Sequence, residues 1–250
     1  MKKSVLSALC ILTGMLLVAS MAIAASGTNV GGAGITGTSH DLSGAGVNAL
    51  YGEAGENRIC IYCHAPHHTV KAEDAAGITY IPLWNHEVTS QTYLMYSNGD
   101  NSPNDENHKS QAMQLLEGIN QPGSVSRLCL SCHDGTVSTN SYGFYNATSQ
   151  AHGAKKVTAT EFEIGGGGNL TNHHPIGFSY ATALASDDEL AQTTANMTGS
   201  VSIGDLLWSG KMECTTCHDV HNTKNAAGAE KFLWKSDANS AFCGTCHLKL

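Results

Sequence analysis

The sequence is short of basic residues and of aromatic side chains, and each shortage narrows the range of functions. It has 13 lysines and arginines against 21 aspartates and glutamates, which gives a formal net charge of -8. A nucleic-acid-binding surface needs clustered positive charge, so no nucleic-acid partner is expected. Aromatic residues make up 6% of the chain while glycine contributes 27 residues, so the polypeptide alone would form a poor hydrophobic core.

Long apolar runs are missing too, except near the first residue. Two lysines precede an apolar run at 5–19, and Ala22-Ile23-Ala24 follows as an A-x-A cleavage signal. We therefore expect a cleaved signal peptide at 1–24 and a secreted mature protein at 25–250, with no membrane span after cleavage. The expected location is extracellular or at the cell surface, with the periplasm as the alternative. An uncleaved membrane anchor is the competing interpretation, because the run is nearly long enough to span a bilayer.

Cysteine is present, but none is left over for a disulfide. Of nine cysteines, eight fall in four Cys-x-x-Cys-His motifs, and Cys10 lies in the expected signal peptide. The motif cysteines are Cys60, Cys63, Cys129, Cys132, Cys214, Cys217, Cys243 and Cys246. The motif histidines are His64, His133, His218 and His247.

The spacing within this motif is typical of covalent haem attachment. Two cysteines three apart lie on one side of a helical turn, where both can form thioether bonds with the vinyl groups of one haem. The next residue, histidine, can reach the iron as its proximal ligand. Zinc knuckles and thiol redox sites are the alternatives, but zinc does not require a histidine after every second cysteine. With 13 histidines in 250 residues, four such histidines by chance have a probability on the order of 10^-5. The sequence therefore predicts four haem c groups.

Two of the motifs belong to a longer internal repeat. Each begins Cys-x-x-Cys-His-x-x-His and is followed by Ala-Ala-Gly and then by Leu-Trp, at Leu83-Trp84 and at Leu233-Trp234. Each half then ends in a second Cys-x-x-Cys-His motif. The chain is too short for four separate haem domains, so the pattern predicts one tetrahaem domain that duplicates a two-haem unit, at about 40–140 and 170–250. Convergence around the haem motif is the alternative.

The rest of the chain is expected to be mostly loop. Polar stretches occupy 97–107 and 138–172, and both are expected to be loops. The alternative for 97–107 is a calcium site, although the stretch lacks the EF-hand pattern. Short helices are expected at 109–117, and from a capping box that begins at Ser186 to about residue 195.

Nine histidines remain for the second axial position of each iron. An iron with two histidine ligands passes electrons and offers no substrate site, whereas a catalytic haem needs an open position. Histidines three residues after a proximal histidine suit a neighbouring haem, and a histidine before a proline has a restricted backbone. The distal candidates are His67, His221, His174, His40 and His86, with methionine ligands as the alternative.

Several ordered segments resemble the doubled-CxxCH multihaem cytochromes c. They are Cys-x-x-Cys-His-Ala65-Pro66-His67, Pro82-Leu83-Trp84-Asn85-His86, Leu128-Cys129-Leu130-Ser131-Cys132-His133-Asp134-Gly135-Thr136, His174-Pro175-Ile176-Gly177-Phe178 and Cys-x-x-Cys-His-Asp219-Val220-His221-Asn222. In size and haem count the chain is most similar to the OmcE-type tetrahaem extracellular cytochrome filaments. The likeness runs from about His40 to His247.

The resemblance implies a mostly irregular fold, with short helices and few strands, wrapped around a chain of four covalently bound haems. It also implies two histidine ligands on every iron, one of them donated by the adjacent subunit, for which His67 is the candidate. We expect the protein to form a secreted filament that conducts electrons to redox partner proteins or extracellular acceptors. We do not expect it to be an enzyme. A monomeric periplasmic carrier and a haem-dependent reductase with one open haem are the alternatives.

Overall fold

The computed structural model describes residues 34–44, 46, 50–52, 55–67, 69, 83–96, 121–143, 155–223 and 231–249. The expected signal peptide, the loop at 97–107 and the expected helix at 109–117 lie outside these residues. Within the described part of the chain, no helix has the length and apolar character needed to cross a membrane.

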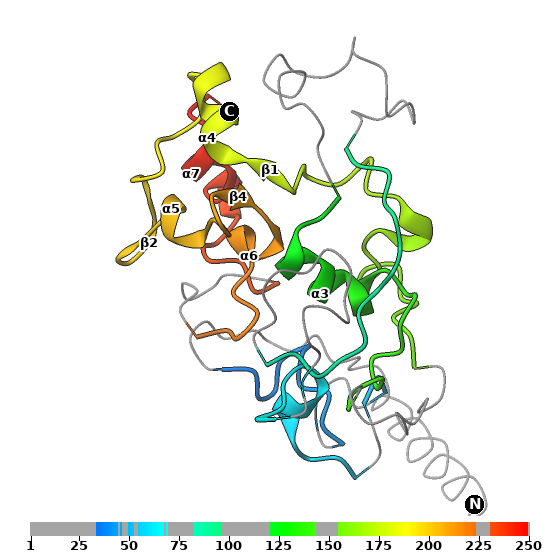
Figure 1. Cartoon of the computed structure of the whole chain (residues 1–250). Coiled ribbons are helices and arrows are strands. Elements are labelled where there is room, and N and C mark those ends of the chain that lie inside the picture. The colour runs from blue at the N-terminus through cyan, green and yellow to red at the C-terminus, as the bar shows by residue number, and fades with distance from the viewer. Residues whose placement is uncertain are drawn as a thin grey trace, which may run out of the picture.

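Short helices alternate with loops and very short strands along the described chain (Figure 1). The helices are η1 (Ile59–Tyr62), α3 (Ser124–His133), η3 (Gly166–Gly168), α4 (Tyr180–Ser186), α5 (Ile203–Leu206), α6 (Cys214–Cys217), η4 (Ala238–Ser240) and α7 (Cys243–Cys246). The strands are β1 (Phe178–Ser179), β2 (Asn196–Thr198), β3 (Val201–Ser202) and β4 (Lys211–Met212). Helix α3 has ten residues and lies near the middle of the view in Figure 1.

The strands form two small antiparallel pairs in the C-terminal half. β1 pairs with β4, in a register that places Phe178 opposite Met212, and β2 pairs with β3. Tyr180 and Ile203 pack with the first of these pairs in a hydrophobic core. Since only Glu213 separates the end of β4 from the start of α6, this packing fixes the position of the third Cys-x-x-Cys-His motif.

A second core holds helix α3 against the loops around it. Leu130 of α3 is 1% exposed and packs with Tyr93, Met95 and Leu170. Leu94 forms a parallel bridge with Asn169, so the segments at 83–96 and 155–172 are joined beside the helix. The second motif, at the end of α3, is therefore enclosed by loops rather than by a sheet or a helix bundle.

The helix expected from Ser186 to about residue 195 is not formed, so that prediction was wrong. Helix α4 ends at Ser186, and the Asp187 carboxylate instead accepts a hydrogen bond from Glu189 N–H at 3.0 Å. Leu190 then forms an antiparallel bridge with His247 of the fourth motif. Long-range pairing with that motif outweighs the local capping signal, and the Asp187 side chain closes a turn where the sequence predicted a helix start.

Candidate functional site

Each Cys-x-x-Cys-His motif forms a helical turn. In three of them the histidine N–H donates to the carbonyl of the first cysteine, at 2.8 Å for His64, 3.0 Å for His218 and 2.9 Å for His247. The other motif occupies the last turns of α3, which ends at His133. Residues three apart on a helical turn are neighbours, so the two thiols of each motif share a side, as attachment to one haem requires.

The same antiparallel bridge holds three of the four motifs. The bridged pairs are His64 with Trp84, His218 with Leu233, and His247 with Leu190. In each bridge, the second cysteine carbonyl and the N–H after the histidine bond to the partner segment, at 2.7–3.1 Å. The second motif has a different support, because the Ile164 N–H donates to His133 O at 2.8 Å. These bonds fix the backbone at each motif histidine.

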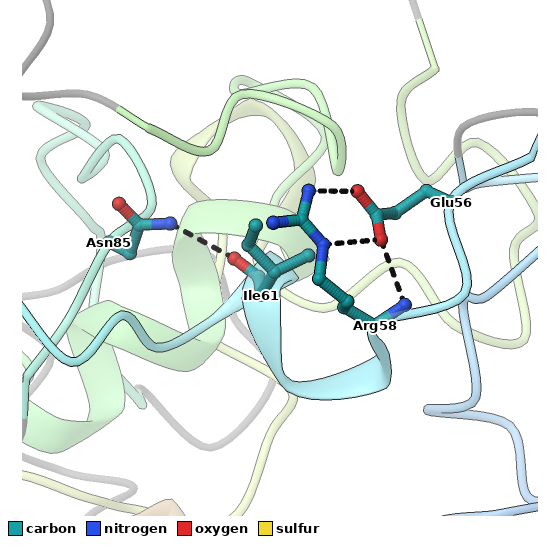
Figure 2. Close-up of polar contacts among 4 residues, drawn as sticks. All are labelled: Glu56, Arg58, Ile61 and Asn85. Carbon is teal, nitrogen blue, oxygen red and sulfur yellow. Dashed lines mark hydrogen bonds and ion pairs between the residues drawn. The ribbon is translucent and has the colours of Figure 1, made fainter.

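The first and third motifs share further details of geometry. Leu83 and Phe232 occupy equivalent places in their bridges, and both have left-handed backbone, with φ of 54° and 60°. The Asn85 and Trp234 side chains each donate to the carbonyl that follows the first motif cysteine, at 3.1 and 3.0 Å. Figure 2 shows the first of these bonds, with Ile61 as acceptor. These matches favour a duplicated unit. They align Leu83 with Phe232 rather than with Leu233, so the two Leu-Trp pairs are shifted by one residue relative to each other.

An ion pair precedes the first motif, and Figure 2 shows it beside the Asn85 bond. Arg58 Nη2 lies 2.6 Å from Glu56 Oε2, and the hydrogen bonds from Arg58 lower the pKa of Glu56 to about 2. The Arg58 side chain is largely exposed, so this pair adds little to stability. Its structural effect is to shape the turn that leads into η1.

Three motif histidines face a second histidine ring across a nearly constant distance. The ring centroids are 6.1 Å apart for His64 and His221, 6.1 Å for His40 and His133, and 6.3 Å for His174 and His247. The planes are inclined by 32°, 51° and 64°, so none of these pairs is a parallel stack. A bond from a metal ion to an imidazole nitrogen is about 2.0 Å long, and the ring centre lies beyond that nitrogen. Two imidazoles bound on opposite sides of one metal ion therefore have their ring centres about 6 Å apart. The residues therefore fit two axial imidazoles on one iron at each of these places.

Backbone carbonyls orient several of these rings. Nδ1 of His133 lies 2.7 Å from Phe162 O, and Nδ1 of His174 lies 2.9 Å from the carbonyl of the next residue. Nδ1 of His218 lies 2.8 Å from Lys231 O. When the ring proton is assigned to Nδ1, each ring donates to its carbonyl and keeps the Nε2 lone pair for a metal. A histidine that ligates a metal is usually held in this way by its other nitrogen.

The remaining candidate histidines are placed differently. His86 is 1% exposed, with Nδ1 2.7 Å from Glu87 O and Nε2 2.9 Å from Ser138 O. Both ring nitrogens therefore face backbone carbonyls, which favours a structural role over iron ligation. His67 is exposed, directly after the first motif. Among the described residues, no second histidine ring faces His218 at the distance seen in the three pairs.

Successive motifs have neighbouring cysteines. The Cys214 N–H donates to Ser126 Oγ of α3 at 3.0 Å, so the second and third motifs are in contact, and the interaction with the Cys214 side chain raises the pKa of the Cys129 thiol. Cys63 is exposed, but the surrounding protein atoms still desolvate its thiol, and this is the largest cause that raises its pKa to about 12. A cysteine of the second motif adds to the shift. Desolvation and then a cysteine of the fourth motif raise the pKa of Cys217 to about 12. The second motif therefore lies near the first and the third, and the fourth lies near the third.

A buried carboxyl group joins the second and third motifs, and the sequence analysis did not identify it. Glu213 is fully buried, and its carboxylate accepts hydrogen bonds from Ser126 Oγ and from the Gly123 N–H at 3.2 Å. A Cβ at Gly123 would lie 2.1 Å from Glu213 Oε1, so this approach requires glycine. Ser126 Oγ also accepts from Cys214 N–H at 3.0 Å. The available signal in the sequence was an acidic residue directly before a Cys-x-x-Cys-His motif, in a chain with only 14% charged residues.

A buried donor beside the first motif lacks a hydrogen-bond partner in the described structure. The Trp84 ring is 8% exposed and lies perpendicular to the His64 ring, with centroids 6.0 Å apart. No acceptor is within reach of its Nε1. Buried polar groups in native proteins nearly always have partners, and a haem propionate is an acceptor that this N–H could use. The surroundings of the first motif thus fit a bound haem.

No protein-family model matches the chain, and no curated protein matches it. Function is therefore inferred from the motif chemistry together with the paired histidine rings and the order of the motifs in space.

Proposed function

We propose that the protein is a secreted tetrahaem c-type cytochrome that polymerises into an extracellular filament and conducts electrons along it. The observation that carries this proposal is the distance of 6.1–6.3 Å between the rings of three histidine pairs, each of which contains one motif histidine. That separation suits two imidazoles on opposite faces of one iron. No residue is assigned as an acid, base or nucleophile.

The motif assigns different roles to its cysteines and its histidines. The eight motif cysteines would hold the four haems covalently, and the four motif histidines would ligate the irons on one face. Haem bound there supplies a redox-active iron, and closely spaced haems pass electrons from one to the next. The histidines that face the motif histidines, His221, His40 and His174, would complete the iron ligation, which would exclude substrate and favour electron transfer.

The order of the motifs supports a continuous path for electrons. Neighbouring cysteines relate the first motif to the second and the third to the fourth. The hydrogen bond from Cys214 N–H to Ser126 Oγ relates the second motif to the third. Helix α3 packs against α6 at this point, with Glu213 and Ser126 joining them. The polypeptide would thus fix the spacing at the centre of the chain of haems.

The third motif is where a second subunit would enter. His218 faces no second histidine ring among the described residues, whereas the other three motif histidines do. His67 is exposed, and it occupies in the first motif the place that His221 occupies in the third. We assign His67 of the adjacent subunit as the distal ligand of this iron, so that ligation and polymerisation would depend on each other.

The same observation at His218 favours a second candidate, a haem-dependent reductase with one open iron. In that case the protein stays monomeric, and one iron in four binds carbon monoxide after reduction. A monomeric carrier with four closed irons would bind none and would elute as a single chain.

Electron microscopy and sizing of the purified, haem-loaded protein distinguish these candidates. The filament proposal predicts polymers for the wild type, and short or monomeric particles for His67→Ala with all four haems retained. In this variant one iron in four should become reactive to carbon monoxide. His173→Ala is the matched control and should polymerise as the wild type does. A wild-type monomer at all concentrations, or fewer than four haems per chain by pyridine haemochrome, would contradict the proposal.

A further inference from the structure

We propose that Asn222 is a positioning residue for His40, the distal histidine of the second motif, and acts through Gly34. This inference rests on the proposed function, because it concerns a ligand of one of the four irons. Under this proposal, the loop that follows the third motif controls the ligation of the iron at the second motif.

Asn222 and Gly34 form a reciprocal pair of hydrogen bonds between distant parts of the chain. The Gly34 N–H donates to Asn222 O at 2.9 Å, and Asn222 Nδ2 donates to Gly34 O at 2.9 Å. Asn222 is fully buried and has left-handed backbone, with φ of 53°. Asparagine tolerates this conformation better than most residues. Gly34 also has positive φ, of 80°, which glycine adopts without strain. Both residues therefore suit this reciprocal pair of hydrogen bonds, which we call the clasp.

The segment that begins at Gly34 is internally rigid up to His40. The Thr38 hydroxyl donates to Ile35 O at 2.6 Å and accepts from the His40 N–H at 3.3 Å. The Asp41 carboxylate accepts from the Gly37 N–H at 2.9 Å. Thr38 and Asp41 are 2% and 4% exposed, so these bonds are shielded from water. A displacement at Gly34 is therefore transmitted to His40 rather than absorbed between them.

The His40 ring is the far end of this segment, and it docks on the same part of the chain as the clasp. It stacks on Phe232 with centroids 4.7 Å apart and planes inclined by 26°. The Val220 backbone also interacts with the ring and raises its pKa, against the larger effect of burial. The ring then faces His133 at 6.1 Å. Desolvation, then the neighbouring His133, lower the pKa of His40 to about 4, which keeps the ring neutral and able to bind metal at neutral pH.

Three consecutive residues of the loop after the third motif thus serve the other motifs. The Val220 backbone interacts with His40, His221 faces His64 at 6.1 Å, and Asn222 forms the clasp with Gly34. Asn222 reaches the segment that carries His40 through its two hydrogen bonds with Gly34, and its effect passes along this route. Loosening the clasp should release His40 and open the second iron, while His221 still faces the first motif.

The experiment compares carbon monoxide binding by reduced, haem-loaded Asn222→Asp, Asn222→Gly and wild type. Both substitutions tolerate the left-handed backbone and remove the Nδ2 donor, so strain is not introduced. We expect one iron in four to bind carbon monoxide at least about fivefold faster than in the wild type, since one buried hydrogen bond is lost. Added imidazole should restore the low-spin spectrum. The control is Asn196→Asp, in which an exposed asparagine that donates to Gly199 O at 2.6 Å is changed.

A double variant tests whether the opened iron is the one that His40 serves. His40→Ala should open one iron, and adding Asn222→Asp should open no further iron. Two open irons in the double variant, or wild-type behaviour of both Asn222 variants, would overturn the inference. If the Asn222 variants do not load haem, Gly34→Pro breaks the same clasp from its other side, because proline lacks the N–H and cannot adopt the positive φ. Fewer than four haems in the wild type would count against the proposed function instead.

Discussion

The His64 ring faces the His221 ring at a centroid distance of 6.1 Å, and the two histidines come from motifs in different halves of the chain. The loop after the third motif therefore reaches back to the first. His221→Ala should remove one axial ligand and leave all eight attachment cysteines intact. We expect four haems per chain by pyridine haemochrome, but a high-spin band and carbon monoxide binding at one iron in four. His173→Ala should remain fully low-spin, and an unchanged spectrum for His221→Ala would contradict the pairing.

His86 should behave differently from the paired histidines. Both of its ring nitrogens lie within 2.9 Å of backbone carbonyls, and its ring is almost completely buried. His86→Ala should therefore destabilise the fold by about 1–3 kcal/mol through lost hydrogen bonds and still leave every iron low-spin. Urea unfolding with absorbance at the haem band measures both effects. Carbon monoxide binding to reduced His86→Ala would show that His86 is a ligand after all.

The sequence predicts the helical turns of the candidate site, because the spacing of Cys-x-x-Cys-His is a local feature. A histidine that follows Cys-x-x-Cys must lie at the end of a helical turn, and the turns at His218 and His247 are closed by hydrogen bonds of 3.0 and 2.9 Å. The matched bridges of the first and third motifs likewise follow from the internal repeat, apart from a shift of one residue. Such features depend on neighbours within a few positions, which a sequence displays directly.

Long-range contacts could not be predicted in this way. His40 faces His133 in a part of the chain where Asn222 bonds to Gly34 and Phe232 stacks on the His40 ring, and no periodicity links these residues. The predicted helix after Ser186 fails for the same reason, since pairing of Leu190 with His247 replaces a locally favourable start. With so little regular secondary structure, tertiary hydrogen bonds decide most of the backbone path.

Asp134 should be the most sensitive polar residue around the second motif. Its carboxylate is 3% exposed and accepts hydrogen bonds from Tyr93 at 2.6 Å, Thr89 at 2.8 Å and Thr136 at 2.7 Å. Asp134→Ala leaves the buried hydroxyls of Tyr93 and Thr89 without this acceptor, so we expect a loss of about 3 kcal/mol in unfolding free energy. Asp188→Ala, at an exposed position, is the control and should change stability by less than about 0.5 kcal/mol. Equal urea midpoints for the two variants would show that the network contributes little.

Glu213 should make the stability of the protein depend on pH. Burial raises the pKa of its carboxyl above the usual value, although hydrogen bonds from Ser126 and Gly123 oppose the shift. The native state therefore binds more protons than the unfolded state between pH about 4.3, the value in the unfolded chain, and the raised folded value. In that window the unfolding free energy must fall as pH rises, because ionising a buried carboxyl costs energy. Glu213→Gln cannot ionise, so its urea midpoint should fall less between pH 5 and pH 8 than that of the wild type. Glu161→Gln, at an exposed position, should follow the wild type, and parallel curves for all three proteins would mean that the buried carboxyl does not set this dependence.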